Sequence, residues 1–287
     1  MVMPNTINTN GSAMLALQSF NRNNSDLAVT ERRISTGKTV TSTKDNGAVW
    51  AVAQGQMGQA KALDVVTDSL NRVQSILDVT LNVSQQLSDD LIQMKSLAMG
   101  LWDRTIPNVE RQAIVDQISI ISGNWDKKVK SATFSGVNLL NSPTGNGTLS
   151  VPLDSDSSAK LTITKTNLTI GYWFNWVTPS ISTTDTFIQI FINNLNSANQ
   201  YVGAAIAQYS SKTREVAATL KATATRQDSL IGAVGNLVDA DMGKESARLQ
   251  AQLAKLQLGA HSLRVANGST SILRSLFRPV TSLAAVA

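Results

Sequence analysis

Apolar residues recur at alternating steps of three and four along two long stretches of the chain, residues 63–101 and residues 202–237. This spacing is typical of helices that pair as coiled coils. Each stretch is long enough to form a rod of roughly 60 Å at about 1.5 Å per residue. The predicted seam residues include Leu70, Val73, Leu77, Leu87, Leu91 and Met94 in the first stretch, and Val202, Tyr209, Val216, Leu230 and Leu237 in the second.

Proline positions divide the chain into the same parts. The six prolines stand at positions 4, 107, 143, 152, 179 and 279, so residues 5–106 and 180–278 contain none. An interior proline costs a helix about 3 kcal/mol, which makes these two tracts the natural places for long helices. The sequence therefore predicts a helical region, a short middle and a second helical region.

Two further elements are predicted between the long helices. Pro107 opens a helix over about residues 108–130, with Ile114, Ile118, Ile121 and Trp125 on one face, and we expect it to fold back on the first seam. Residues 142–184 are rich in turn formers. There Leu161 and Ile163 alternate with threonine, and Asn146-Gly147 is a turn signal, so we expect one or two hairpins.

The two ends of the chain carry a weaker apolar pattern. Its residues are Ala13, Phe20, Leu27 and Ile34 near the start, and Leu249, Leu253, Leu256, Ala260 and Leu263 near the end. The positions between them are too polar to offset the ordering entropy of an isolated helix. We expect these ends to be disordered in the monomer and to fold on assembly. The fold class is mainly α, a long antiparallel coiled-coil helical rod of paired N- and C-terminal regions, with a small β-hairpin-rich insertion.

Composition excludes several classes of function. The chain has no cysteine, so it has no disulfides, thiol nucleophile or cysteine-based metal site. The net charge of +5 is spread thinly and forms no basic stripe, so no nucleic-acid partner is expected. No stretch reaches the roughly 20 apolar residues of a membrane span, and the first ten residues do not resemble a cleaved secretory signal. Any export therefore needs a route that does not depend on such a signal.

The sequence contains no motif that indicates an enzyme. The single histidine, His261, lies within the last apolar pattern, where a surface or interface role is favoured over catalysis. There is no nucleophile elbow, zinc-protease helix, phosphate loop or dinucleotide fingerprint. Helix capping accounts for the acidic cluster at 239, 241 and 245 at least as well as a cation site does. We predict no catalytic residue, no cofactor and no metal. The aromatic run Tyr172, Trp173, Phe174 and Trp176 could stack on sugars or a partner protein, but a local hairpin core is favoured.

Several motifs resemble the bacterial flagellins. Residues 33–38 read Arg-Ile-Ser-Thr-Gly-Lys and residues 43–48 read Thr-Lys-Asp-Asn-Gly-Ala, as in the N-terminal flagellin signature. Residues 132–140 resemble the turn in which a phenylalanine and a glycine close the N-terminal helical region. Residues 237–241, 245–251, 257–259, 271–273 and 276–278 resemble the C-terminal signature. The short middle is most like that of flagellins from alphaproteobacteria.

This resemblance implies a layered organisation. It predicts an inner terminal coiled-coil layer from residues 1–44 and 240–287, a helical rod layer from 45–141 and 181–239, and an outward-facing variable β region at 142–180. Gly37 would end the first helix in a left-handed cap, Asp45 would begin the next helix, and residues 38–44 would join the two layers. The predicted self-assembly residues are Phe20, Leu27, Arg33, Ile34, Gly37, Asp45, Leu249, Leu253, Leu256, Leu263, Leu276 and Phe277.

The resemblance also implies a function. The chain is expected to be a secreted structural subunit that polymerises into the extracellular flagellar filament for swimming motility. Its expected partners are other flagellin subunits, including paralogues, an export chaperone with the flagellar secretion apparatus, the filament cap and the hook–filament junction protein. Two alternatives are open: a hook–filament junction protein, or a surface glycan-binding flagellin homologue that uses the Tyr172 to Trp176 aromatics. Residues 279–287 extend beyond the usual flagellin end.

Overall fold

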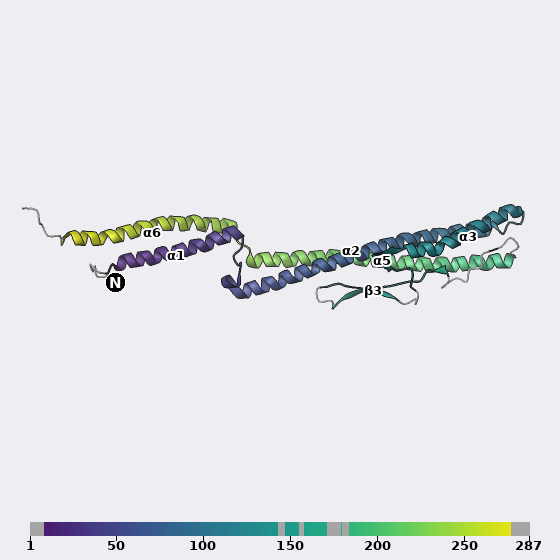
Figure 1. Cartoon of the computed structure of the whole chain (residues 1–287), viewed down its shortest axis with the longest axis horizontal. Coiled ribbons are helices and arrows are strands. Elements are labelled where there is room, and N and C mark those ends of the chain that lie inside the picture. The colour runs from purple at the N-terminus through teal and green to yellow at the C-terminus, as the bar shows by residue number, and fades with distance from the viewer. Residues whose placement is uncertain (1–8, 143–146, 155–157, 171–178, 180–183, 277–287) are drawn as a thin grey trace, which may run out of the picture. The chain divides into compact units, whose positions relative to one another are not determined.

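The computed structural model describes residues 9–142, 147–154, 158–170, 179 and 184–276, and these residues are mainly helical (Figure 1). The helices are α1 (Gly11–Thr36), α2 (Thr43–Gly100), α3 (Asn108–Ser131), α5 (Asp185–Val238) and α6 (Met242–Leu276). The strands are β1 (Thr133–Phe134), β2 (Val137–Asn138), β3 (Thr148–Pro152) and β4 (Lys160–Thr164). The predicted fold class, long helices with a small hairpin insertion, is confirmed.

The chain forms two compact units. Met1–Gln56 together with Gly232–Ala287 form the first, which we name the terminal unit, and Met57–Ile231 form the second, the central unit. Helices α2 and α5 each contribute residues to both units. The two ends of the sequence therefore come together in one unit.

The core of the central unit is shared by α2, α3, α5 and both hairpins. The predicted seam residues of α2 lie at the centre of this core. Leu70, Leu77, Leu87 and Met94 are fully buried, and Val73 and Leu91 are nearly so. These side chains lie on one face of α2 because a three-four spacing follows the helical repeat. Helix α3 spans the predicted residues and packs Ile118 and Trp125 into the same core, so its predicted return onto α2 is confirmed.

The seam of α5 follows the prediction except at its last position. Val202, Tyr209 and Val216 are buried and Leu230 is half-buried, whereas Leu237 is 37% exposed. Val238 is buried instead. It is the last residue of α5, and its carbonyl accepts hydrogen bonds from the amides of Thr39 and Val40. This backbone contact, which a heptad count does not include, fixes which side of the helix end turns inward.

The first hairpin follows α3 directly. Strands β1 and β2 pair antiparallel, with Phe134 opposite Val137. The two residues between them, Ser135 and Gly136, have φ of 49° and 77°. Two positive φ angles in a two-residue loop match the tight turn that suits the twist of paired strands. The predicted turn at the end of the N-terminal helical region is confirmed.

The second hairpin pairs β3 with β4, and Val151 lies opposite Leu161. Leu161 and Ile163 are buried while the threonines between them are exposed, as the alternation predicts. Of the turn predicted at Asn146-Gly147, only Gly147 is described. The Gly147 carbonyl accepts a hydrogen bond from the Lys165 amide, so Gly147 continues the pairing, and the connection between the strands runs through residues 153–159. Asn146 and the Tyr172 to Trp176 aromatics lie outside the described residues.

Two buried aromatic side chains hold the segment that follows β4. The Tyr209 hydroxyl donates to the Leu139 carbonyl (2.9 Å) and accepts from the Thr166 amide (3.0 Å). The Trp125 indole N–H donates to the Leu168 carbonyl (2.7 Å). The Tyr209 hydroxyl adds to the direct hydrogen bond between the Thr166 amide and the Leu139 carbonyl (2.8 Å), and the Trp125 indole provides a partner for the Leu168 carbonyl. Over the part of the chain that is described, no helix combines the length and apolar character needed to cross a membrane.

Candidate assembly interface

Helices α1 and α6 run antiparallel, side by side, in the terminal unit (Figure 1). Asn10 caps α1, because its Oδ1 accepts a hydrogen bond from the Ala13 amide (3.0 Å). The Nδ2 of the same side chain donates to the Ala266 carbonyl of α6 (2.8 Å). Further along, the Asn23 Nδ2 donates to the Gln252 carbonyl (3.0 Å). Asparagine side chains therefore join the two helices at the start of α1 and near its middle.

Apolar contact between α1 and α6 is limited. A Cβ atom at Gly259 would lie 3.3 Å from the Phe20 ring, so glycine lets the ring approach the α6 backbone. Within the 26 residues of α1, only Leu27 and Thr30 are buried. Among the predicted assembly residues, Phe20, Ile34, Leu249, Leu256 and Leu263 are half-buried and Leu253 is 45% exposed. The side chain of Leu276 and all of Phe277 lie outside the described residues.

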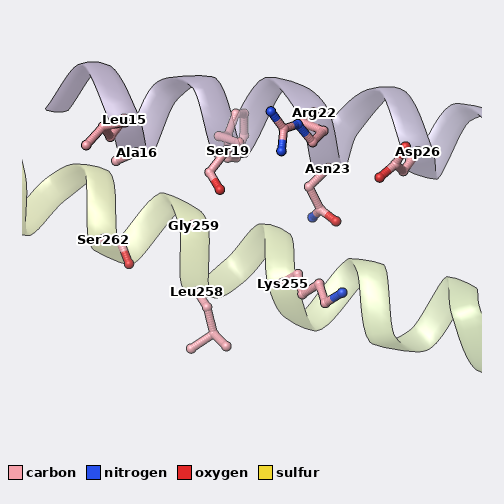
Figure 2. Close-up of a pocket in the computed structure, with 11 residues that line it drawn as sticks. Leu15, Ala16, Ser19, Arg22, Asn23, Asp26, Lys255, Leu258, Gly259 and Ser262 are labelled. Atoms are coloured by element: carbon pink, nitrogen blue, oxygen red, sulfur yellow. The ribbon is translucent and has the colours of Figure 1, made fainter. Parts of the chain in front are cut away.

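An open groove of about 610 Å³ runs along this helix pair (Figure 2). Leu15, Ala16 and Ser19 of α1 line it together with Lys255 and Leu258 of α6. A second groove continues towards the chain ends. It is lined by Ser12, Ala16, Leu258, His261, Ser262, Val265 and Ala266.

Large apolar side chains remain exposed on both helices, and three of them, Leu15, Leu258 and Val265, line these grooves. Their exposed fractions are 64% for Met14, 53% for Leu15, 47% for Leu17, 66% for Leu258 and 72% for Val265. Clustered exposure of this kind marks an interaction surface. These five residues are not among the predicted assembly residues, because they lie outside the single apolar stripe on which the prediction for each helix was based. The additional apolar residues between the stripe positions could have predicted this exposed surface.

The connection from α1 to α2 is fixed against the start of α6. Gly37 has φ of 69° and ends α1 in a left-handed cap, as predicted. Its carbonyl accepts a hydrogen bond from the Ala240 amide (2.9 Å), and the Thr39 amide donates to the Val238 carbonyl (2.6 Å). Lys38 and Asp239 pair as an isolated antiparallel bridge. This short ladder determines where the chain leaves the α1–α6 pair.

Asp45 does not begin α2, contrary to the prediction. Asn46 has non-helical angles (φ −161°, ψ 101°), and its Oδ1 accepts from the Val49 amide (3.1 Å), so Asn46 is the capping residue. The Asp45 Oδ2 faces back and accepts hydrogen bonds from the Thr41 hydroxyl (2.7 Å) and the Thr41 amide (2.9 Å). These bonds, with the charge of Arg32, lower the pKa of Asp45 to about 2. Asp45 therefore stabilises the connection between α1 and α2, and Asn46 caps the helix.

The buried carboxylate of Glu245 closes this junction. Its side chain is 4% exposed, and its Oε1 lies 3.4 Å from Arg33 of α1 and 2.8 Å from Arg248 of α6. Asp241 caps α6 through a hydrogen bond from the Lys244 amide (3.0 Å). Ion pairing and capping thus account for two members of the predicted acidic cluster. Among the described residues, no three potential metal ligands gather in one place.

Comparison with known proteins decides the family. A family model described as the bacterial flagellin N-terminal helical region matches residues 7–144. Flagellin FljO of Caulobacter vibrioides is 38% identical over 96% of this chain and 99% of its own length. The chain belongs to the bacterial flagellin family.

Other relatives fit this membership. A flagellin of Brucella melitensis is 30% identical over 95% of this chain and 99% of its own. A solved structure described as a flagellar hook-associated protein from Vibrio parahaemolyticus has a TM-score of 0.55 at 9% identity, covering 68% of this chain and all of its own, which shows a shared fold. The resemblance to alphaproteobacterial flagellins is confirmed. This flagellin is a structural subunit of the flagellar filament, which lies outside the cell.

Proposed function

We propose that this flagellin joins the filament by laying its α1–α6 pair against the same pair of neighbouring copies. Residues 1–44 and 240–287 form the inner layer, residues 45–141 and 181–239 form a rod layer around it, and residues 142–180 face outward. The supporting observation is the row of exposed apolar side chains on both helices, Leu15 and Leu258 among them. A further copy of the same two helices carries the same exposed apolar side chains and so offers a matching partner.

The energetics favour association of this pair with neighbours. With Leu27 as the one buried apolar side chain of α1, the pair gains little from its own contacts. Each exposed leucine, methionine or valine contributes roughly 1.5–3 kcal/mol when it is fully buried. Because these five side chains are already partly covered, their burial contributes an amount comparable with the lower half of an association cost of about 4–15 kcal/mol. Assembly therefore supplies the stability that the isolated pair lacks.

The predicted assembly residues divide by what they contact. Phe20 and Leu27 hold α1 against α6 within one subunit, whereas Leu253 faces outward from the pair. Gly37 and Arg33 belong to the junction that sets the direction of the chain leaving the pair. We propose that the first group maintains the pair and that the outward group, extended by Leu258 and Val265, contacts the next subunit.

The same weak pairing suits export. Helices with so few buried contacts unfold at little cost, which a subunit needs if it is carried unfolded through the flagellar secretion apparatus. An export chaperone binds the subunit before this step, and the filament cap and the hook–filament junction protein contact the filament at its two ends.

Seeded polymerisation tests the proposal. Purified full-length chain is mixed with sheared filament fragments and examined by electron microscopy. Long filaments growing from the seeds are the expected result. Failure to extend seeds while binding to their ends in a few copies would instead identify a hook–filament junction protein.

Surface variants test the location of the interface. Leu258→Asn and Val265→Asn change side chains that are exposed beside α1 and leave the Phe20 contact intact. We expect either variant to prevent seed extension while the helical circular dichroism of the central unit is unchanged. Thr162→Asn, at an exposed position of β4 in the outward-facing hairpin, is the control and should polymerise normally.

A further inference from the structure

His261 lies on the proposed assembly surface, in the groove lined by Ser12, Ala16, Leu258 and Val265. Its side chain is exposed in the isolated subunit, and within the described residues no hydrogen bond or ion pair holds the ring. It is the only histidine of the chain, and there is no cysteine. Histidine is the side chain whose charge ordinarily changes between pH 5 and 8.

Carboxylates are absent from this end of the helix pair. The sequence contains no aspartate or glutamate in residues 1–25 or in residues 246–287. On α1, the element packed against α6, no side chain from residue 9 to residue 21 is ionisable, and the first is the cation Arg22. On α6, the charged neighbours of His261 along the helix are Lys255 and Arg264, both cations.

The four acids of the terminal segments all lie at the other end of the pair. Asp26 and Glu31 stand on the second half of α1, and Asp241 and Glu245 stand at the start of α6. Because the helices are antiparallel, these positions share the junction end, and Figure 2 shows Asp26 at the opposite end of the groove from Ser262. The end that carries His261 is therefore cationic and apolar.

We propose that assembly of this flagellin requires the neutral form of His261 and is weakened when this side chain carries a proton. The inference rests on the proposed function, since it concerns the same surface. It makes His261 a pH-sensitive element of polymerisation.

The physical reason is that a protonated His261 would lose its hydration on assembly and would gain no carboxylate partner in return. When a second copy covers the groove, a protonated imidazole loses water and gains no carboxylate, because the corresponding segments of the other copy are equally free of acids. It also adds a positive charge to a stretch of α6 whose charged residues on either side of His261, Lys255 and Arg264, are already cations. The neutral ring avoids both the desolvation of a charge and the repulsion by these cations. Assembly therefore releases protons, and by linkage it strengthens as the pH rises and weakens as the pH falls.

The test measures the critical concentration for seeded growth of the full chain at pH 7.5 and pH 6.0. One linked proton changes it by at most about tenfold per pH unit, and we expect a rise of about fourfold at the lower pH. His261→Gln should assemble like the natural chain at pH 7.5 and lose most of this rise. His261→Lys keeps a positive charge at both pH values and should have a raised critical concentration at both.

Direct proton release provides a readout that needs no variant. Natural subunits are seeded in weakly buffered solution at pH 6.5, and released protons are titrated as filaments grow. A substantial fraction of one proton per subunit is expected. An unchanged pH dependence in His261→Gln, or no proton release, would overturn the inference. Stronger assembly at pH 6.0 would also overturn it and would indicate that Asp26 of a neighbour reaches His261. Absence of filaments at every pH contradicts the proposed function itself.

Discussion

The Arg33 Nη1 lies 3.4 Å from the Glu245 Oε1, and this ion pair joins the last turn of α1 to the first turn of α6. The two residues are 212 positions apart in the sequence. Together with the hydrogen bond between Gly37 and Ala240, this ion pair fixes the point at which the chain leaves the α1–α6 pair. The junction therefore depends on a buried charge as well as on backbone pairing.

Removing the charge of Glu245 should weaken assembly. In Glu245→Gln, Arg33 and Arg248 lose their acidic partner, and hydrogen bonds to charged groups contribute about 1.5–3 kcal/mol each when buried. Both arginines are partly exposed, so we expect the lower part of that range and a critical concentration about tenfold higher. Asp228→Asn removes an exposed carboxylate of α5 and serves as the control for net charge. Equal effects of the two variants would contradict a special role of Glu245.

Gly37→Ala should weaken assembly through the backbone alone. A Cβ at Gly37 meets nothing within 4 Å, so the cost is that of holding alanine at positive φ, about 1–2 kcal/mol. We expect the critical concentration to rise by about fivefold to thirtyfold, and Gly37→Asn to have a smaller effect because asparagine tolerates this conformation. Gly55→Ala, at an exposed helical glycine with equal space, should be neutral or stabilising. An effect of Gly37→Ala no larger than that of Gly55→Ala would refute the argument.

Tyr209→Phe should destabilise the central unit. The variant removes the hydroxyl bonded to Leu139 and Thr166 and leaves the ring in place. The Thr166 amide also donates to the Leu139 carbonyl, so we expect a loss of about 1–2 kcal/mol in the free energy of unfolding, measured in urea at pH 8. Tyr201→Phe, at a ring that is 44% exposed, is the control.

The same tyrosine should make the central unit sensitive to alkali. Burial raises the pKa of Tyr209 above its usual value of 10.0, outweighing the hydrogen bonds from Thr166. Its contribution is fully present below the unfolded value and is lost as the pH rises through the folded one. Urea unfolding should therefore become easier above about pH 10, less so in Tyr209→Phe. The ultraviolet titration of the chain should include one tyrosine that ionises late.

Asp45 should titrate far below an ordinary aspartate. Its pKa of about 2 results first from the Thr41 hydroxyl bond, so Thr41→Val should move the value towards 3.8. The stabilising effect of this lowered pKa is present above 3.8 and is lost as the pH falls through about 2. Carbon-13 NMR of the carboxyl group in the full chain measures both values. A midpoint near 3.8 in the natural chain would show that the Thr41–Asp45 turn does not form in solution.

Amide exchange should separate the monomer from the filament. Because so few side chains of α1 are buried, we expect amides of residues 10–35 to exchange rapidly in dilute monomer and slowly in filaments, while the α2 seam is protected in both. Strong protection of residues 10–35 in the monomer would refute folding on assembly.

Much of this protein follows from local pattern. The three-four spacing identified the α2 seam from Leu70 to Met94, the opening of α3 at Pro107, and the alternation of Leu161 and Ile163, because helical and strand periodicity depend only on which residues share a face. Gly37 was predictable for a similar reason, since a left-handed cap is a local conformational demand. The sequence motifs were also sufficient to predict the family.

Tertiary contacts decided the rest. The last inward residue of α5 is Val238 and not Leu237, because the Thr39 amide binds the Val238 carbonyl from 199 positions away. Asp45 faces Thr41 and leaves the cap of α2 to Asn46, a choice made by loop hydrogen bonds. The exposure of Leu15, Leu258 and Val265 could be determined only from the structure, in which α1 and α6 are paired. Periodicity shows which side chains share a face, but only the packed structure shows which faces are still uncovered.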